Sequence, residues 1–107
     1  MGQLAYGFDG HHYVIDDRTL RHLRAAMFAK LRRREPFALT LRGDATAGSA
    51  AETLWVEPAI PLRFVFDSEE SGPLDREWLE RLVAAANSAG GMQVETEEIE
   101  PPLALVG

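Results

Sequence analysis

The sequence predicts an α+β domain in which a mostly antiparallel sheet carries two helices on one face, in the order β-β-α-β-β-β-α-β. Two segments repeat apolar side chains at helical spacing, and six short segments alternate apolar and polar side chains as strands do. Turn-forming residues separate these segments, and the sequence has no internal repeat. With 107 residues and 46% hydrophobic content, the chain suits one core. We expect a single domain over residues 1–100 and an apolar tail over 101–107.

The first two predicted strands form a hairpin. QLAYGF and HHYVID flank Asp9-Gly10, a dipeptide that tolerates the positive φ angles of a two-residue turn. Such a turn places Tyr6 opposite Tyr13 and Leu4 opposite Ile15. One side of the hairpin is therefore predicted to be aromatic and aliphatic.

A helix is predicted from Arg18 to Arg34. Asp16 and Asp17 precede it, and carboxylates there accept the unpaired N–H groups of a helix start. Pro36 disfavours helical geometry at the residue before it, which ends the helix. At 100° per residue one stripe is apolar and faces the core, formed by Leu20, Leu23, Met27 and Leu31.

Three strands are predicted in the middle of the chain. FALTLR (37–42) precedes a glycine- and alanine-rich loop, GDATAGSAA, and is followed by ETLWVE (52–57) and LRFVFD (62–67). The last two are predicted to pair antiparallel through the connection between Pro58 and Pro61.

The second predicted helix follows Asp75, which can cap it, while Leu74 and Leu79 occupy the positions of a hydrophobic staple. Gly90-Gly91 suits its end, and MQVETEEI is predicted as the last strand. The side chains predicted to face inward are Leu79, Leu82, Val83 and Ala86.

Positive charge is concentrated on the first helix, although the chain carries a net charge of -6. Residues 1–50 have a balance of +3 and residues 51–107 a balance of -9. This asymmetry favours contact between the halves, between copies of the chain, or with an anionic partner. The basic flank predicted to bind a partner consists of Arg18, Arg21, Arg32 and Arg33, with His22 beside it.

Several chemistries find no support in the sequence. The absence of cysteine excludes disulfides, thiolate catalysis and cysteine-ligated zinc. His11 and His12 point to opposite faces of a strand, and Asp16 and Asp17 act as caps, so we expect no metal site. Neither a nucleophile elbow nor a phosphate-binding glycine motif with its lysine is present. We therefore expect no catalytic residues and no cofactor.

No stretch reaches the ~18 apolar residues of a membrane span, and we expect a cytoplasmic protein with no membrane partner.

The stretches MGQLAYG, DDRTLRHLRAAMFAKLRRREPFAL, WVEPAIPLRFVFD and NSAGG resemble a family of short uncharacterised actinobacterial proteins, many of which carry the automatic label ATP-dependent DNA ligase. The resemblance covers the whole chain apart from the tail, and it implies a link to DNA ligation or repair. A nucleotidyl-transferring ligase needs a lysine nucleophile followed two residues later by Asp-Gly. Lys30 is the only lysine and is followed by Leu31-Arg32-Arg33, so adenylation by this chain alone is not expected.

A second candidate contact surface lies on the outer side of the sheet around Trp55. Alternation sends Leu54 and Val56 toward the helices and Trp55 to the outer side of the sheet, near Arg63. A tryptophan beside arginine is typical of an interaction hot spot or of a base-stacking platform. Alternatively, the apolar tail folds over Trp55.

The sequence thus predicts a binding or adaptor domain without catalytic activity. Protein–protein contact, including self-association as a homodimer, is the main hypothesis. Binding of nucleic acid through the basic helix is the alternative, with salt-sensitive affinity as its signature.

Overall fold

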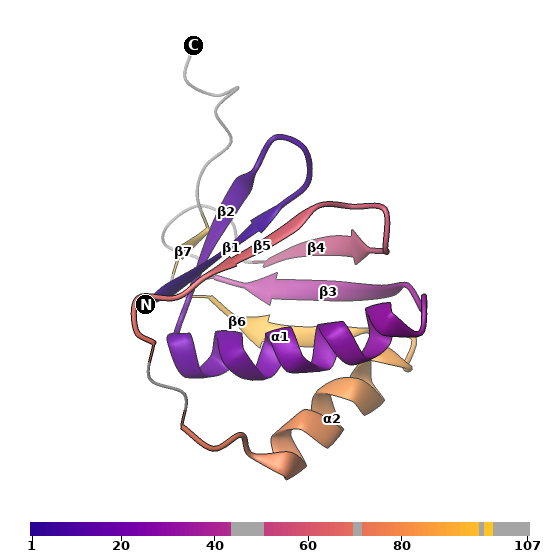
Figure 1. The fold of residues 1–107 in the computed structure, drawn as a ribbon. Helices are drawn as coiled ribbons and strands as arrows, with labels where there is room; N and C mark the ends of the chain where they lie inside the picture. Colours follow the sequence, from indigo (N-terminus) through magenta and orange to yellow (C-terminus); the bar gives the residue numbers. More distant parts are fainter. Residues whose placement is uncertain (44–50, 70–71, 97, 100–107) are drawn as a thin grey trace.

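The computed structural model describes residues 1–43, 51–69, 72–96 and 98–99 (Figure 1). The predicted tail at 101–107, and most of the predicted loop after residue 43, lie outside these residues. The fold class and the order of the elements are confirmed, but the predicted last strand, MQVETEEI, is divided into two strands, Met92–Glu95 and Glu98–Ile99. The elements are β1 (Gly2–Tyr6), β2 (His11–Ile15), α1 (Asp17–Arg32), β3 (Phe37–Arg42), β4 (Ala51–Val56), β5 (Leu62–Val65), α2 (Arg76–Ala86), β6 (Met92–Glu95) and β7 (Glu98–Ile99).

The described strands form two sheets. The order is β5-β1-β2-β7 in one sheet and β4-β3-β6 in the other, where β3 and β6 run parallel. The predicted pairing of β4 with β5 is wrong, because β5 pairs with β1 and β4 pairs with β3. The intervening segment turns sharply, with the Ile60 N–H donating to the Glu57 carbonyl at 3.1 Å. That turn carries the chain from one sheet to the other.

The hairpin of β1 and β2 has a longer turn than predicted. Leu4 faces Tyr13 and Tyr6 faces His11, so the register is shifted by two residues. Gly7 and Gly10 both have positive φ, and the Gly10 N–H donates to the Gly7 carbonyl. Together they allow a four-residue loop. A shift of two residues preserves the faces, so the predicted apolar side of the hairpin still faces inward.

Both helices begin at the predicted caps. The Asp16 carboxylate accepts from the Thr19 N–H, and the Asp75 carboxylate accepts from the Trp78 N–H, both at 3.2 Å. The α1 helix ends at Arg32, earlier than predicted, because Arg34 has a φ of 59°. The N–H of Arg34 bonds to the Leu31 carbonyl and that of Glu35 to the Lys30 carbonyl. These two bonds form a Schellman motif, which closes the helix before Pro36 can act.

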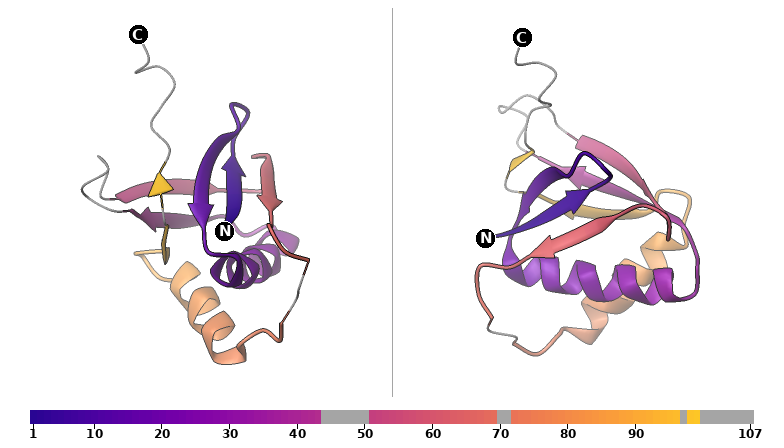
Figure 2. Two further views of the ribbon diagram at one scale, coloured as in Figure 1. Left: turned by 90° about the vertical axis from the view of Figure 1, so that its left-hand side faces the viewer. Right: turned by 45° about the horizontal axis from the view of Figure 1, so that its top comes forward.

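The core lies where the two sheets and α1 meet, and both helices lie on the same side of the strands (Figures 1 and 2). The predicted stripe of α1 is confirmed, since Leu20, Leu23 and Met27 are fully buried and Leu31 packs against them. Two tyrosines of the hairpin reach across to β4. Tyr6 Oη donates to the Trp55 carbonyl, and Tyr13 Oη donates to the Glu52 carboxylate at 2.6 Å. These bonds fix the hairpin on the second sheet.

Candidate functional site

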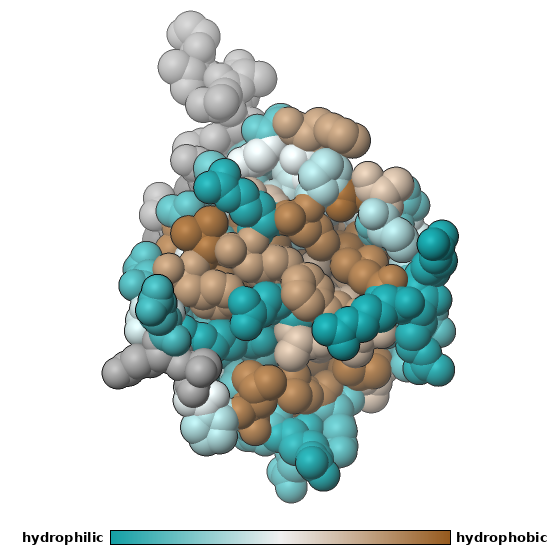
Figure 3. All heavy atoms as spheres, in the orientation of Figure 1, coloured by the Kyte–Doolittle hydropathy of each residue, from teal (hydrophilic) through white to brown (hydrophobic). Residues whose placement is uncertain are grey.

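The flank of α1 and the strand β5 run side by side and form one surface. Helix residues 21–32 follow β5 in the opposite direction, so Arg21 lies at the Phe66 end and Arg32 at the Ile60 end. Figure 3 shows this side of the molecule, where apolar side chains gather over β5 and α1 with hydrophilic side chains among them. We call it the α1–β5 face, and it consists of Arg21, Arg24, Phe28, Arg32, Ile60, Leu62, Phe64 and Phe66.

Aromatic rings and guanidinium groups alternate along this face. The guanidinium carbons of Arg21 and Arg24 lie 5.2 and 4.6 Å from the ring centroid of Phe66. The Phe28 ring meets the Phe64 ring edge-on at 5.6 Å and is 39% exposed. A cation over a ring is attracted by its π electrons, so both arginines are held in place without neutralising their charge. The face therefore combines ordered positive charge with exposed aromatic surface.

The arginines of this face have no carboxylate partner within the described residues. The ion pairs there join the N-terminal amine to Asp17 and Asp67, and Lys30 to Glu35. Arg21 donates to the backbone carbonyl of Ser68, which is a neutral acceptor. Within the part of the chain that the structure describes, the positive charge of the face is therefore not neutralised by a carboxylate.

A hollow of about 310 Å³ lies at the Arg32 end of the face. Phe28, Leu31, Pro58 and Ile60 line it, together with the charged Arg32 and Glu57. Its walls are mostly apolar, so an apolar side chain can fill it while the ends of the charged side chains stay hydrated.

Arg18 belongs to another part of the molecule. Its guanidinium group lies 5.1 Å from the ring of Trp78 on α2, and that ring stacks on the buried His22 at 4.2 Å. Both nitrogens of His22 are engaged, since Nδ1 donates to the Arg18 carbonyl and Nε2 accepts from the Asp75 N–H. His22 was predicted beside the basic flank but is 1% exposed. This cluster fastens α2 to α1.

The other predicted contact residues lie apart from the α1–β5 face. Arg33 is exposed at the C-cap of α1. Trp55 is 54% exposed, as predicted, on the outer face of the β4-β3-β6 sheet. Arg63 pairs with Ala5 in the other sheet, so the pairing of β4 with β5 from which its place near Trp55 was predicted is not formed. Arg42 shares the Trp55 sheet but is bound to Gln93.

Lys30 is 6% exposed, and its ammonium group donates to the Asn87 side chain and pairs with Glu35 at 3.0 Å. The bond to Lys30 lowers the pKa of the Glu35 carboxyl. The lysine therefore joins the end of α1 to the end of α2. Its nitrogen is held by two acceptors, which is unsuited to nucleophilic attack.

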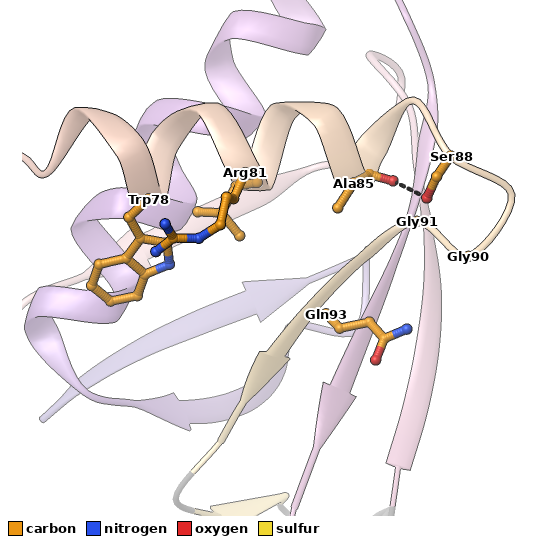
Figure 4. Close-up of a pocket in the computed structure, with 8 residues that line it drawn as sticks. Trp78, Arg81, Ala85, Ser88, Gly90, Gly91 and Gln93 are labelled. Atoms are coloured by element: carbon orange, nitrogen blue, oxygen red, sulfur yellow. Dashed lines mark hydrogen bonds between the residues drawn. The ribbon is translucent and has the colours of Figure 1, made fainter.

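Two other hollows offer fewer groups that could bind a ligand. One of about 420 Å³ lies between α2 and β6, lined by Trp78, Arg81, Gly90, Gly91 and Gln93 among others (Figure 4). Among its lining residues, Arg81 carries the one charged side chain, and none has a carboxylate. Another, at the start of α1, is lined by His22, Asp16 and Asp17, but the ring nitrogens of His22 are already bonded. Among the described residues, no group of three His, Asp or Glu could hold a metal ion, and no helix is long and apolar enough to cross a membrane.

The described residues define a small α+β domain with two sheets and paired helices. Residues 1–97 match the family model DUF7882, a domain of unknown function, and the chain belongs to that family. No significant match is found among curated proteins or among solved structures.

Sequence reasoning missed two members of the α1–β5 face on the helix itself. Arg24 and Phe28 lie beside Arg21 on a helical wheel, so the wheel alone could have grouped them. It could not have found Phe66, because the place of β5 beside α1 depends on its pairing with β1.

Proposed function

We propose that this domain binds a protein partner through the α1–β5 face and carries out no chemistry of its own. One observation carries the proposal: Arg21 and Arg24 are ordered over Phe66 with no carboxylate partner among the described residues, next to the exposed ring of Phe28. Aromatic residues, including phenylalanine, and arginine are enriched at protein interfaces. Prior ordering of the arginines reduces the entropy lost on binding.

The partner should present acidic side chains around an apolar one. Arg24 and Arg32 lie toward opposite ends of the face. The ring of Phe28 lies between them, and the hollow lies at the Arg32 end. Carboxylates can pair with the arginines, and an apolar side chain can enter the hollow. A protein segment meets both demands, whereas a phosphate backbone meets only the first.

The test compares three immobilised baits in an extract of the native cells: the wild-type protein, R24E/R32E and R76E/R81E. The last variant is a matched control, because Arg76 and Arg81 are exposed on α2 and the change in net charge is identical. Quantitative mass spectrometry should find at least one protein enriched on the wild type and the control and lost on R24E/R32E.

Thermal unfolding of the three baits first establishes that each is folded. Equal recovery of every protein on all three baits, or recovery of none by the wild type, would contradict the proposal. Recovery that depends on nucleic acid and disappears after nuclease treatment would also contradict it.

Self-association through the Trp55 sheet is a second candidate, favoured by the exposure of Trp55 beside the small or polar Ala38, Thr40 and Thr53. A second copy of this face would cover the indole. Sedimentation equilibrium should then give a dimer whose mass returns to that of the monomer in Trp55→Ser. A wild-type protein that stays monomeric at high concentration would exclude this form.

Nucleic-acid binding remains the alternative, in line with the ligase label on proteins that the sequence resembles. It would use Arg18, Arg21, Arg32 and Arg33, and R21E/R32E should then abolish it. The affinity for labelled duplex and single strands should fall steeply with salt. No detectable binding near 50 mM salt, where surface charges are weakly screened, would exclude it.

A further inference from the structure

Within the described residues, the strand β5 has one edge without a strand partner. It is the terminal strand of its sheet, and β1 is its only strand partner among the described residues. The Pro61 carbonyl accepts from the Gly7 N–H, which makes that pair a hydrogen-bonded one. Hydrogen-bonded pairs alternate along antiparallel strands, so Arg63 and Val65 bond to β1. The N–H and C=O groups of Leu62 and Phe64 therefore point outward.

We propose that the partner adds to this edge as an antiparallel strand with acidic and apolar side chains in alternate, defined places. The inference rests on the proposed function and specifies how the α1–β5 face binds. An added strand supplies acceptors and donors to the outward groups of Leu62 and Phe64. Exposed edges of this kind are templates for pairing.

Charge complementarity indicates the side chains of that strand. On the added strand, the side chains that point to the α1 side would lie beside Phe66 with its two arginines, beside Phe64 with its ring contact to Phe28, and beside Leu62. Leu62 is two residues along the chain from Ile60, which lines the hollow together with Arg32. The matching residues are acidic, apolar and acidic in turn. On the opposite side of the strand the neighbours are the exposed Arg63 and Val65, where one further carboxylate can pair.

A second copy of the same edge fits this site less well. Pairing of β5 with β5 would bring two sets of arginines without carboxylate partners onto one continuous surface. Like charges that face one another on one surface repel each other, whereas an acidic segment would neutralise the arginines. We therefore assign the edge to a separate acidic segment.

The probe is the acetylated, amidated and fluorescently labelled heptapeptide Thr-Asp-Thr-Val-Glu-Asp-Thr, designed to place valine opposite Phe64. Two further versions carry a single N-methyl group. Methylation at valine blocks the amide that would bond to the Phe64 carbonyl, while methylation at glutamate blocks an amide that would point away from β5. The two methylated peptides have the same mass and charge.

Anisotropy titrations are carried out near 50 mM salt, where surface charges are weakly screened. The unmodified and glutamate-methylated peptides should bind with similar Kd values. The valine-methylated peptide should bind at least about tenfold more weakly, as expected for the loss of a hydrogen bond in a shared network. R24E/R32E should weaken all binding, and R76E/R81E should not.

Equal binding of the three peptides would overturn strand addition and leave a face that attracts acidic segments by charge alone, so the proposed function would stand. No binding of any peptide at about 1 mM would overturn the inference as a whole. The proteins recovered on the three baits test the proposed function separately, because that comparison makes no assumption about the shape of the partner.

Discussion

Replacing His22 with alanine tests the cluster that fastens α2 to α1. The imidazole is 1% exposed, bonds the Arg18 carbonyl at 2.7 Å and the Asp75 N–H at 2.8 Å, and stacks on Trp78. Alanine removes the ring and leaves the Asp75 amide without its partner. The two helices should lose their most specific contact.

The expected cost is about 2 to 4 kcal/mol. Two hydrogen bonds contribute roughly 1 kcal/mol each, and the aromatic stack contributes about 0.5 to 1.5 kcal/mol beyond the area that it buries. An unfolding entropy of about 2.1 cal/mol/K per residue means that 1 kcal/mol shifts the Tm of a chain this size by about 4.5 °C. The Tm of His22→Ala should therefore fall by about 9 to 18 °C.

Differential scanning calorimetry of His22→Ala and the matched His11→Ala measures this cost. His11 is half-buried and makes a tilted ring contact with Tyr13, so its removal should cost less than about 1 kcal/mol. Nitrogen-15 spectra should also find the proton of His22 on Nδ1. Equal losses in the two variants, or a proton on Nε2, would refute the reasoning.

Three further predictions concern the backbone and one buried tyrosine. Arg34→Gly should raise the free energy of unfolding by about 0.5 to 1 kcal/mol in urea titrations, because glycine adopts a φ of 59° without strain. Gly91→Ala should cost roughly 2 kcal/mol or more, since its Cβ would lie 2.5 Å from a carbonyl oxygen at a φ of 70°, whereas Gly90→Ala should change little. Burial and the bond to Glu52 raise the pKa of Tyr13 above its usual value of 10.0. The unfolded chain therefore loses the phenolic proton first, so stability should fall above about pH 10, by up to ~1.4 kcal/mol per pH unit, and Tyr13→Phe should flatten that fall.

The alternation of side chains predicted which residues face the core, but it could not predict which strands pair. Leu54 and Val56 are buried and Trp55 is exposed, as their order along the strand requires. The pairing of β5 with β1 follows a turn between Glu57 and Ile60, which a hydrogen bond between these two loop residues closes. Such bonds leave no periodic signal.

The candidate site was also predicted only in part from the sequence. The basic flank was visible in the sequence because helical spacing groups Arg21 with Arg32. The burial of Lys30 and His22 was not visible, because both depend on where α2 docks, and their partners Asn87 and Asp75 are more than fifty residues away. The docking of α2 therefore places Arg18 and His22 in a structural cluster with Trp78, whereas Arg21 and Arg32 lie on the α1–β5 face.

The rate at which single backbone amides of β5 exchange with deuterium, measured by NMR on the free protein, tests the accessible edge most directly. Arg63 and Val65 should be protected by their bonds to β1, while Leu62 and Phe64 should exchange at least about tenfold faster. Equal protection of all four amides would mean that something already covers the edge, and it would contradict the assignment of this face to a partner.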